Sequence, residues 1–542
     1  MKNFFHFTFN FIILISSASF SQGSELNIGA NYILYPSNVN QSEVFITAHP
    51  TNPDVLFASA NTIVFVPFFV SEGIYVTTNG GNNWFGSDTC NGPNISFHQG
   101  DPGVSIDRYG RFILTRLGKQ PFYGIYSHYS TDNGINWSPQ KTITSEGEFE
   151  KASIVSDNNP TSPYYGRTYA TWVKLSGSFP VEFSFTDDIS QSWNQILTIN
   201  SFTQRSSGAD IEIGNNGEVF IAYALVSDIS PFNETAISFA KSINGGTTWS
   251  VMNNVFPING INGTLPQKSN IRVNGLPRIT VDKSNSSNRG TIYIVTTQKN
   301  LAPAGSDPDI ILYKSTDNGL SWSGGIRVNQ DALNNGKTQY FPAIDVDQYG
   351  GINIIYYDDR TTTNDSASVF LSRSTDGGLT WSDFNISDHN FKPQPIGGLG
   401  QGYQGDNIDI VCVGDKMFPV WMDNSTGIYQ IWTAAISINP NNVEDAIDLI
   451  TDFRLFQNYP NPFNPSTRIS WQSPVDGWQT LKIFDVLGNE VATLVNEFRP
   501  KGFYEINFSI SQWPEINLKS GIYFYQLNVG EYTETKKMVL IR

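Results

Sequence analysis

The chain has 542 residues, enough for more than one domain, and only 15% of them are charged. The formal net charge of −16 argues against nucleic acid or an anionic membrane as the main partner, because both need basic patches. Aromatic residues, Gly, Asn and Ser are plentiful and helix-forming runs are scarce, which favours an all-β chain.

Residues 1–21 have the pattern of a secretory signal. Lys2 precedes an apolar run from Phe11 to Ile15, and small residues follow up to Ser21. Since no Cys follows the cleavage region, we do not expect a lipoprotein anchor, and no later apolar run is long enough to be a transmembrane segment. The sequence predicts an exported, soluble protein.

A turn of the form Ser/Thr-x-Asp/Asn-x-Gly-x-x-Trp recurs six times at long intervals. Its third and eighth positions are Asn79 and Trp84, Asp132 and Trp137, Asp188 and Trp193, Asn244 and Trp249, Asp317 and Trp322, and Asp376 and Trp381. Ser190 replaces the Gly in the third copy. Self-similarity at this period is typical of a propeller or a solenoid.

The residue types of this turn point to a structural role. The leading hydroxyl and the Asp or Asn can bond nearby backbone groups, and Gly at the fifth position can adopt backbone angles that other residues resist. The Trp can then pack between sheets, with its indole N–H bonding an acceptor. One active site does not need six copies of its residues, so we interpret the turns as hairpin closures.

The turn resembles the Asp-box, or BNR repeat, of the sialidase-like propellers, which implies a β-propeller over residues 22–438. An apolar strand, a turn and an aromatic-rich strand precede each copy, as in residues 209–224 and 343–359. A seventh unit, residues 407–437, lacks the box, and the segment Asn31–Val39 can supply its fourth strand. Joining the ends of the ring in this way removes exposed sheet edges. The residues thus predict seven blades, whereas the resemblance to six-bladed sialidases predicts six.

The composition and residue pattern of the chain change after a short acidic linker, residues 439–452. Residues 453–542 contain a Pro-rich start (Asn458–Pro465), a Leu-Gly-Asn turn (Leu487–Asn489) and an alternating strand (Ser520–Val529). Each Pro fixes its own φ and biases the preceding residue, so the start is extended. These features predict a small β-sandwich.

This segment closely resembles the C-terminal sorting domain of proteins exported by the type IX (Por) secretion system. The motifs that match are Asn458–Pro465, Asp485–Gly488, Ser520–Tyr525 and Lys536–Met538. The resemblance implies that the type IX secretion machinery is a partner and that the protein is secreted or attached to the outer cell surface. It also implies that the segment is a sorting signal that directs export and does not carry the protein's own activity.

An aligned position near the start of the first strand of each unit is the main candidate site. It holds Glu43, Asp101, Lys151, Gly208, Leu276, Phe341 and Asp406 in the seven units. Carboxylates converging there could bind sugar hydroxyls, coordinate Ca²⁺ or form a general acid and base pair. The alternative, which the sequence favours, is that they cap their strands by bonding local backbone. We predict no specific metal site or cofactor, and Ca²⁺ is a possible ligand only.

A second set of polar residues lies at the ends of the second strands. It comprises Arg116, Asp358, Asp359, Arg360 and Asp423. Arg360 and Arg278 could together clamp a carboxylate, because guanidinium groups bind carboxylates at two points. Asp–Arg surface pairs are the alternative explanation. The two cysteines, Cys90 and Cys412, are expected on neighbouring units as free thiols.

Three classes of function remain open. The sequence favours a propeller that binds a glycan or another extracellular ligand, a protein included, without chemistry. A sialidase-like glycoside hydrolase is the first alternative, with Asp101, Asp406 and Arg278 as candidate catalytic residues. However, the Arg-Ile-Pro motif of sialidases is absent, and no Tyr–Glu pair is apparent. A structural or adhesive surface protein is the second alternative.

Overall fold

The computed structural model describes residues 26–438, except 94, 120–121, 146, 151 and 201–203, and residues 453–541, except 459–460 and 510–517. These fall into two compact units, of which one contains Leu26–Ile438 and the other contains the described part of Asn439–Arg542. The described residues are almost entirely strands and turns, so the predicted all-β class is confirmed. The predicted signal, residues 1–21, and linker, residues 439–452, lie outside the described residues.

The first unit consists of antiparallel sheets that follow one another along the chain. The first three sheets contain β3 (Asn40–His49), β4 (Asn52–Phe65), β5 (Phe68–Glu72), β6 (Ile74–Thr77) and β7 (Phe85–Ser87); β8 (Gly103–Ile106), β9 (Phe112–Gly118), β10 (Gly124–Ser130) and β11 (Lys141–Thr144); and β12 (Ser153–Ser156), β13 (Thr168–Val173), β14 (Val181–Thr186) and β15 (Leu197–Thr198).

Three further sheets continue the series. They contain β16 (Arg205–Ile213), β17 (Val219–Val226), β18 (Glu234–Ser242) and β19 (Ser250–Pro257); β22 (Arg278–Val281), β23 (Ile292–Gln298), β24 (Asp309–Ser315) and β25 (Ile326–Arg327); and β26 (Gln339–Val346), β27 (Ile352–Asp358), β28 (Ser368–Ser374) and β29 (Ser382–Asn385). A small insertion, the paired β20 (Gly263–Leu265) and β21 (Ile271–Val273) with a 3₁₀ turn at Pro266–Lys268, separates the fourth sheet from the fifth.

The last sheet of this unit combines both ends of the described segment. It contains β30 (Asp409–Val413), β31 (Lys416–Asp423), β32 (Gln430–Thr433), β33 (Ile436–Ile438), β1 (Leu26–Ile28) and β2 (Tyr32–Ile33). Tyr32 pairs with Thr433 and Leu26 pairs with Ile438, so the outermost strand comes from the N-terminal segment. This confirms the predicted role of that segment, although the paired part begins at Leu26 and is interrupted between β1 and β2.

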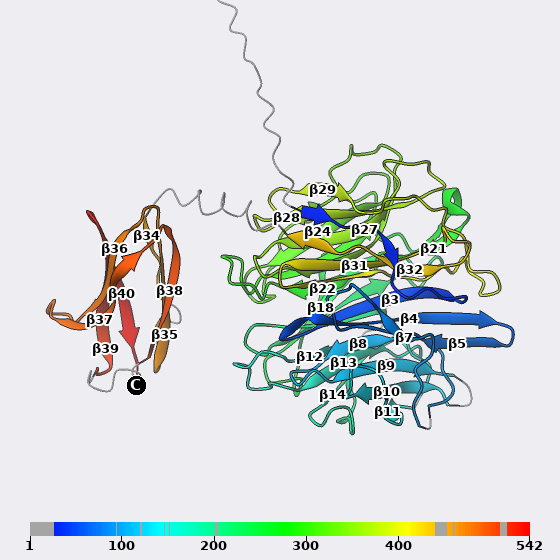
Figure 1. The fold of residues 1–542 in the computed structure, drawn as a ribbon, viewed down its shortest axis with the longest axis horizontal. Helices are drawn as coiled ribbons and strands as arrows, with labels where there is room; N and C mark the ends of the chain where they lie inside the picture. Colours follow the sequence, from blue (N-terminus) through cyan, green and yellow to red (C-terminus); the bar gives the residue numbers. More distant parts are fainter. Residues whose placement is uncertain are drawn as a thin grey trace, which may run out of the picture. The chain divides into compact units, whose positions relative to one another are not determined.

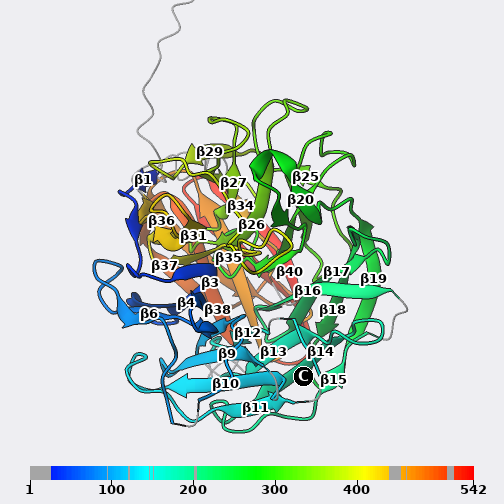
Figure 2. The ribbon, with the colours of Figure 1, turned by 90° about the vertical axis from the view of Figure 1, so that its right-hand side faces the viewer.

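The innermost strands of the seven sheets contact one another in a closed cycle: β3, β8, β12, β16, β22, β26, β30 and again β3. In Figure 2 the colours run once around this ring, from blue through cyan and green to yellow. A closed ring of radially arranged antiparallel sheets is a β-propeller. Apolar side chains fill the space between neighbouring sheets, as where Phe57 of β4 stacks on Phe112 of β9.

All six repeated turns use the same pair of hydrogen bonds. In the second copy the Ser130 hydroxyl accepts from the N–H of Gly134 (2.9 Å), and Asp132 accepts from the N–H of Asn136 (2.9 Å). Trp137 is buried against Phe57 of the preceding sheet, and its Nε1 donates to the Gly134 carbonyl. The remaining copies repeat both backbone contacts. The expected hairpin closure is therefore confirmed.

The third copy keeps the same backbone despite its substitution. Ser190 has a φ of +64°, in the left-handed region that Gly adopts without strain. Its hydroxyl is buried, bonds the Ser127 hydroxyl and accepts from Nε1 of Trp193 (3.1 Å). These local hydrogen bonds offset the backbone strain, which explains how a Ser is accommodated at a Gly position.

The second unit is a small β-sandwich (Figure 1). One sheet contains β34 (Arg454–Leu455), β35 (Ser466–Ser473) and β38 (Gly502–Ser509); the other contains β37 (Glu490–Arg499), β36 (Gly477–Phe484), β39 (Gly521–Val529) and β40 (Tyr532–Leu540). Trp471, Leu481 and Tyr525 belong to the apolar core between them. The predicted turn joins β36 to β37, with Asp485 accepting from the N–H groups of Leu487 and Asn489.

Candidate functional site

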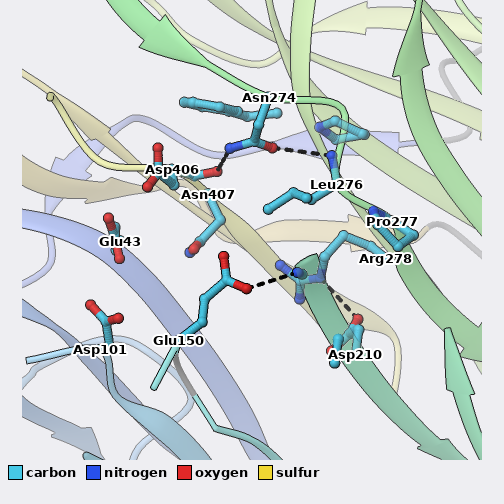
Figure 3. A pocket seen from close by; sticks show the side chains of 14 residues that line it. Glu43, Asp101, Glu150, Asp210, Asn274, Leu276, Pro277, Arg278, Asp406 and Asn407 are labelled. Atoms are coloured by element: carbon cyan, nitrogen blue, oxygen red, sulfur yellow. Dashed lines mark hydrogen bonds and ion pairs between the residues drawn. The ribbon is translucent and has the colours of Figure 1, made fainter. Parts of the chain in front are cut away.

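A pocket lies at the face of the ring where the innermost strands begin, which we call the N-terminal face. Figure 3 shows the side chains that converge there from several sheets. The pocket is lined by Glu43, Asp101, Glu150, Gly208, Ala209, Asp210, Asn274, Leu276, Pro277, Arg278, Phe341, Pro342, Asp406 and Asn407. Six of the seven aligned positions are among these residues, and the seventh, Lys151, lies outside the described residues.

The backbone at several of these positions is unusual. Glu43, Asp101, Gly208 and Phe341 have φ values of +53°, +52°, +61° and +53°. In β3, β16 and β26 this position coincides with a break in strand register. A bulge of this kind re-aims a side chain, and left-handed backbone at non-Gly residues clusters at functional sites. The repeated bulge explains why residues of unrelated type occupy equivalent places around one pocket.

Glu43 is the most buried carboxyl group of the pocket, with 5% of the residue exposed. Burial, followed by the charges of Asp101 and Asp406, raises its pKa well above the usual value, while Arg272 and the Tyr403 hydroxyl oppose this shift. A carboxyl group whose pKa is raised is more readily protonated, and in that form it can donate a proton or a hydrogen bond. The site thus combines one buried carboxyl group of raised pKa with the neighbouring carboxyl groups of Asp101 and Asp406.

Asp101 is held in place by Asn61 of β4. The N–H of Asp101 donates to the Asn61 Oδ1 (2.6 Å), and Asn61 Nδ2 lies 3.4 Å from Asp101 Oδ1. Asn61 Nδ2 also donates to the Tyr403 hydroxyl (3.1 Å), which contacts the Ser42 hydroxyl next to Glu43. The Asn61 side chain of the first sheet therefore links Asp101, which precedes the second sheet, with Tyr403 in the loop before Asp406.

Asp406 forms an ion pair with Arg272 of the β20–β21 insertion. Arg272 Nε lies 3.0 Å from Asp406 Oδ1, and Nη2 contacts Oδ2. The N–H of Arg272 donates to the Gly402 carbonyl (2.7 Å), and Asn274 donates to the Asp406 carbonyl (3.1 Å). The insertion is also anchored by Lys268, whose buried ammonium contacts Asp359 (2.7 Å). It thus reaches from the fourth and fifth sheets to the sixth and seventh beside the pocket.

Arg278 lines the pocket, but its donors are directed to protein acceptors. Its Nε lies 3.1 Å from Asp210 Oδ2, its Nη2 lies 2.8 Å from Asp409 Oδ1, and its Nη1 donates to the Ile408 carbonyl. Its side chain is only 15% exposed. In this arrangement Arg278 neutralises two aspartates, and it does not present a clamp to an anionic ligand.

The other two candidate arginines do not line this pocket. Arg116 is fully buried and donates to His128 (3.0 Å), to Gln140 (2.7 Å) and to the carbonyls of Leu117 and Ser96. Arg360 pairs with Asp358 and Asp383 within the sixth sheet. The structure therefore does not bring Arg360 together with Arg278, because their sheets direct them to separate local carboxylates. Asp359 pairs with Lys268, and Asp423 pairs with His389.

Three residues in or beside the pocket are not predicted by the sequence. Tyr403 lies beside Glu43, although 360 positions separate them. Arg272 lies in the short inserted strand β21, and Asn274 directly follows this strand. A Tyr–Glu contact is thus present that sequence reading did not find. The only sequence signal for Tyr403 is its place directly before the repeated Gln-Gly-Asp segment that ends at Asp406.

Within the described ranges, no group of three or more His, Cys, Asp or Glu side chains is placed to hold a metal ion. The cysteines are both free: Cys90 is buried after β7, and Cys412 lies on the innermost strand β30, as predicted. Burial and the charges of Asp345 and Asp347 raise the pKa of Cys412 well above its usual value. Neither thiol is therefore set up as a nucleophile.

Comparison with known families identifies two segments. Residues 457–541 match the model of the secretion system C-terminal sorting domain. The chain carries a type IX sorting domain. Such a domain marks a protein for export to the cell surface or the medium, which confirms the predicted localisation. Residues 128–139, the second copy of the repeated turn, match the BNR/Asp-box repeat. In the described part of the chain, no helix is both long and apolar enough to cross a membrane.

Similarity to whole proteins is more distant. A comparison with curated proteins finds no match. A protein of unknown function from Dyadobacter fermentans DSM 18053 is 13% identical, with 64% of this chain and 97% of that chain covered and a TM-score of 0.41. A PL25 ulvan lyase is 12% identical (74% and 95% covered, TM-score 0.46), as is a leech intramolecular trans-sialidase (64% and 68%, TM-score 0.40). At these TM-scores none of the likenesses bears on the ligand.

Proposed function

We propose that this protein is an exported seven-bladed Asp-box propeller that binds a carbohydrate in the pocket of its N-terminal face. Support for seven blades comes from the closed cycle of innermost strands, in which each sheet contacts the next and β30 returns to β3. The last sheet is completed by β1 and β2, so every sheet in the cycle has an innermost strand and an outer one.

The chemistry of the pocket lining carries the proposal. Carboxyl groups of Glu43, Asp101 and Asp406 stand beside the amides of Asn274 and Asn407, which together offer both acceptors and donors to sugar hydroxyls. Leu276, Phe341 and two prolines supply apolar surface for the C–H faces of a sugar ring. A few polar groups set among apolar ones are typical of a small-molecule site.

The charge of the pocket favours an uncharged sugar. Among its described residues, Arg272 and Arg278 are the nearby cations, and both face aspartates. An anionic sugar would therefore find both of these guanidinium groups already paired with carboxylates of the protein. We accordingly propose a neutral glycan and not a sialoside as the ligand.

Binding of the full exported chain to an array of neutral, amino and sialylated glycans tests this proposal. We expect signals from neutral glycans that Asp101→Asn reduces at least tenfold, a loss of about 1.4 kcal/mol. Asp228→Asn is the matched control, because Asp228 is exposed and pairs only weakly with Arg205 (3.4 Å). No glycan binding, or binding that survives Asp101→Asn, would contradict the proposal and favour a structural or adhesive role.

Hydrolysis of a glycoside is the second candidate function, and the raised pKa of Glu43 is the observation that favours it. In such a reaction the Glu43 carboxyl would give its proton to the glycosidic oxygen, while a water activated by a neighbouring carboxylate would add to the sugar carbon. Glu43→Gln should then abolish turnover of fluorogenic neutral glycosides yet keep binding within about threefold. A protein that binds but never turns over these substrates would be a lectin-like binder.

A further inference from the structure

We propose that the tip of the β4–β5 hairpin is a second sugar subsite, so that the ligand is an oligosaccharide reaching from the pocket to this tip. The inference rests on the proposed carbohydrate binding and adds the length of the ligand to it. β4 and β5 extend beyond the other strands of the first sheet, on the same side of the ring as β21 (Figure 1).

The hairpin tip exposes apolar side chains in an ordered pair. Phe65 and Phe68 are direct partners across the two strands, and they are 39% and 56% exposed. Their ring centroids are 6.3 Å apart, and Val66 between them is 90% exposed. Because burying such side chains is favourable, a hairpin that displays them at its tip is typical of a binding surface.

The tip is connected to the pocket through one strand and one loop. Asn61, which bonds both Asp101 and Tyr403, lies on β4 four residues before Phe65. At about 3.3 Å per residue this separation is about 13 Å. On the other side, Phe65 approaches Gly398, in the loop that continues to Tyr403 and Asp406. The tip is thus at the distance of a short oligosaccharide from the pocket, beyond the reach of one sugar.

The chemistry of the tip fits a sugar ring. The C–H groups on one face of a neutral sugar are apolar and slightly positive, and they stack on the negative face of an aromatic ring. The patch is small and is joined to a polar pocket, whereas a stable protein interface needs a much larger area. A membrane is disfavoured because the chain has a net charge of −16 and anionic headgroups require Lys and Arg.

The test compares ligand lengths. Neutral oligosaccharides that bind the full exported chain are titrated as a series from monosaccharide to hexasaccharide against wild type, Phe65→Ala/Phe68→Ala, and Phe68→Ser alone. We expect both variants to bind the longer members at least about tenfold more weakly and the monosaccharide within about twofold. Tyr109→Ala is the control. Tyr109 is an aromatic residue that is 63% exposed, and it lies in the turn between β8 and β9, where an innermost strand ends and not at the face where the pocket lies.

Each other outcome overturns the inference in a distinguishable way. Equal binding of long members by wild type and both variants would show that the tip is not a subsite. Equal loss at all lengths would show that the hairpin only supports the pocket. Binding to phosphatidylcholine vesicles that the variants lose would assign the tip to a lipid surface. If wild type binds no sugar at all, the proposed function itself fails, and the inference fails with it.

Discussion

Arg272 and Asp406 form a two-point ion pair at the pocket although 134 positions separate them in the chain. The two side chains come from different sheets, and the insertion that carries Arg272 has no counterpart between the other sheets described. Burial raises the pKa of Glu43 most, Asp101 and Asp406 raise it further, and Arg272 lowers it, so the two members of the ion pair act on the buried carboxyl in opposite directions. The ion pair is therefore a structural link whose arginine opposes the upward shift of the Glu43 pKa.

Removal of the arginine tests that control. Arg272→Met should raise the pKa of Glu43 further, because the nearby cation is lost while Asp101 and Asp406 remain. We expect only about 1 kcal/mol of lost stability, since both partners are partly exposed. Titration of the Glu43 carboxyl by ¹³C NMR measures the effect, with Arg205→Met as a control on an exposed pair. A Glu43 pKa that falls in Arg272→Met would refute the assignment.

We expect Asp345 to make the stability of the propeller depend on pH. Burial beside a cavity between the innermost strands raises its pKa to about 7, from 3.8. Between these values the folded chain holds a proton that the unfolded chain has released, so the free energy of unfolding falls as pH rises from about 4 to about 7. We expect about 2 kcal/mol, because the residue is only partly shielded from water.

Urea unfolding of wild type and Asp345→Asn at a series of pH values checks this prediction. The variant loses one acceptor for the N–H groups of Cys412 and Val346 and should be less stable throughout, but its slope against pH in this window should be smaller. Asp228→Asn, at an exposed position in the same ring, serves for comparison. Parallel pH dependences for Asp345→Asn and wild type would exclude Asp345 as the cause.

His389 joins the sixth sheet to the seventh beside the N-terminal segment. Its Nδ1 lies 2.7 Å from Asp388 and its Nε2 2.8 Å from Asp423, and Asp388 also exchanges hydrogen bonds with Asn31. Burial alone would lower the pKa of His389, but the hydrogen bonds and charges of Asp388 and Asp423 outweigh it and raise the pKa. The resulting stability is present below the unfolded pKa of about 6.5 and is lost as pH rises through the folded value.

We therefore expect His389→Gln to lower the melting temperature more at pH 5.5 than at pH 9. The loss at pH 5.5 should be about 1 kcal/mol, because the imidazole is partly exposed. Differential scanning calorimetry at the two pH values measures it. The substitution Asp388→Asn should abolish part of the same difference, and a loss that does not depend on pH would mean that His389 acts by packing on Trp432 alone.

Two glycines of positive φ allow the steric and backbone effects of an Ala substitution on stability to be separated. The first belongs to the fourth copy of the repeated turn. Gly246 has a φ of +87°, and an added Cβ would lie 2.5 Å from the Phe183 ring. Gly177 has a φ of +65° with nothing within 4 Å of such a Cβ. Gly177→Ala should cost about 1 kcal/mol for the backbone alone, and Gly246→Ala about 1–3 kcal/mol more through overpacking. Equal losses in urea unfolding would rule out the predicted crowding.

Much of the ring could be predicted because its information is local and repeated. The turns around Asp132 and Asp317 recur with fixed spacing, and alternating segments such as residues 343–359 have the period of a strand. Even the closing strand at Tyr32 follows from counting, since the seventh unit lacks an outer strand. Repetition compensates for the weakness of any single strand signal.

The pocket could be predicted only in part, because its contacts are long-range. The aligned position found Glu43, Asp101 and Asp406, but alignment of strands says nothing about side chains from loops. Arg272 lies in the short inserted strand β21 and Tyr403 in a loop, and their place beside Glu43 depends on how the insertion crosses the ring. For the same reason the sequence does not predict that Arg278 pairs with Asp210 and Asp409, and only the structure shows this.

The pairing of Leu26 with Ile438 has a consequence for how the protein matures. The last sheet cannot be completed until more than four hundred intervening positions are available, so ring formation is governed by a contact of the longest possible range in this unit and is expected to be slow. Joining the ends of this unit at Leu26 and Ile438, and opening the chain between two other sheets, would transfer this long-range closing contact to another part of the ring. Such a circular permutant should reach the same native ring with an altered folding rate.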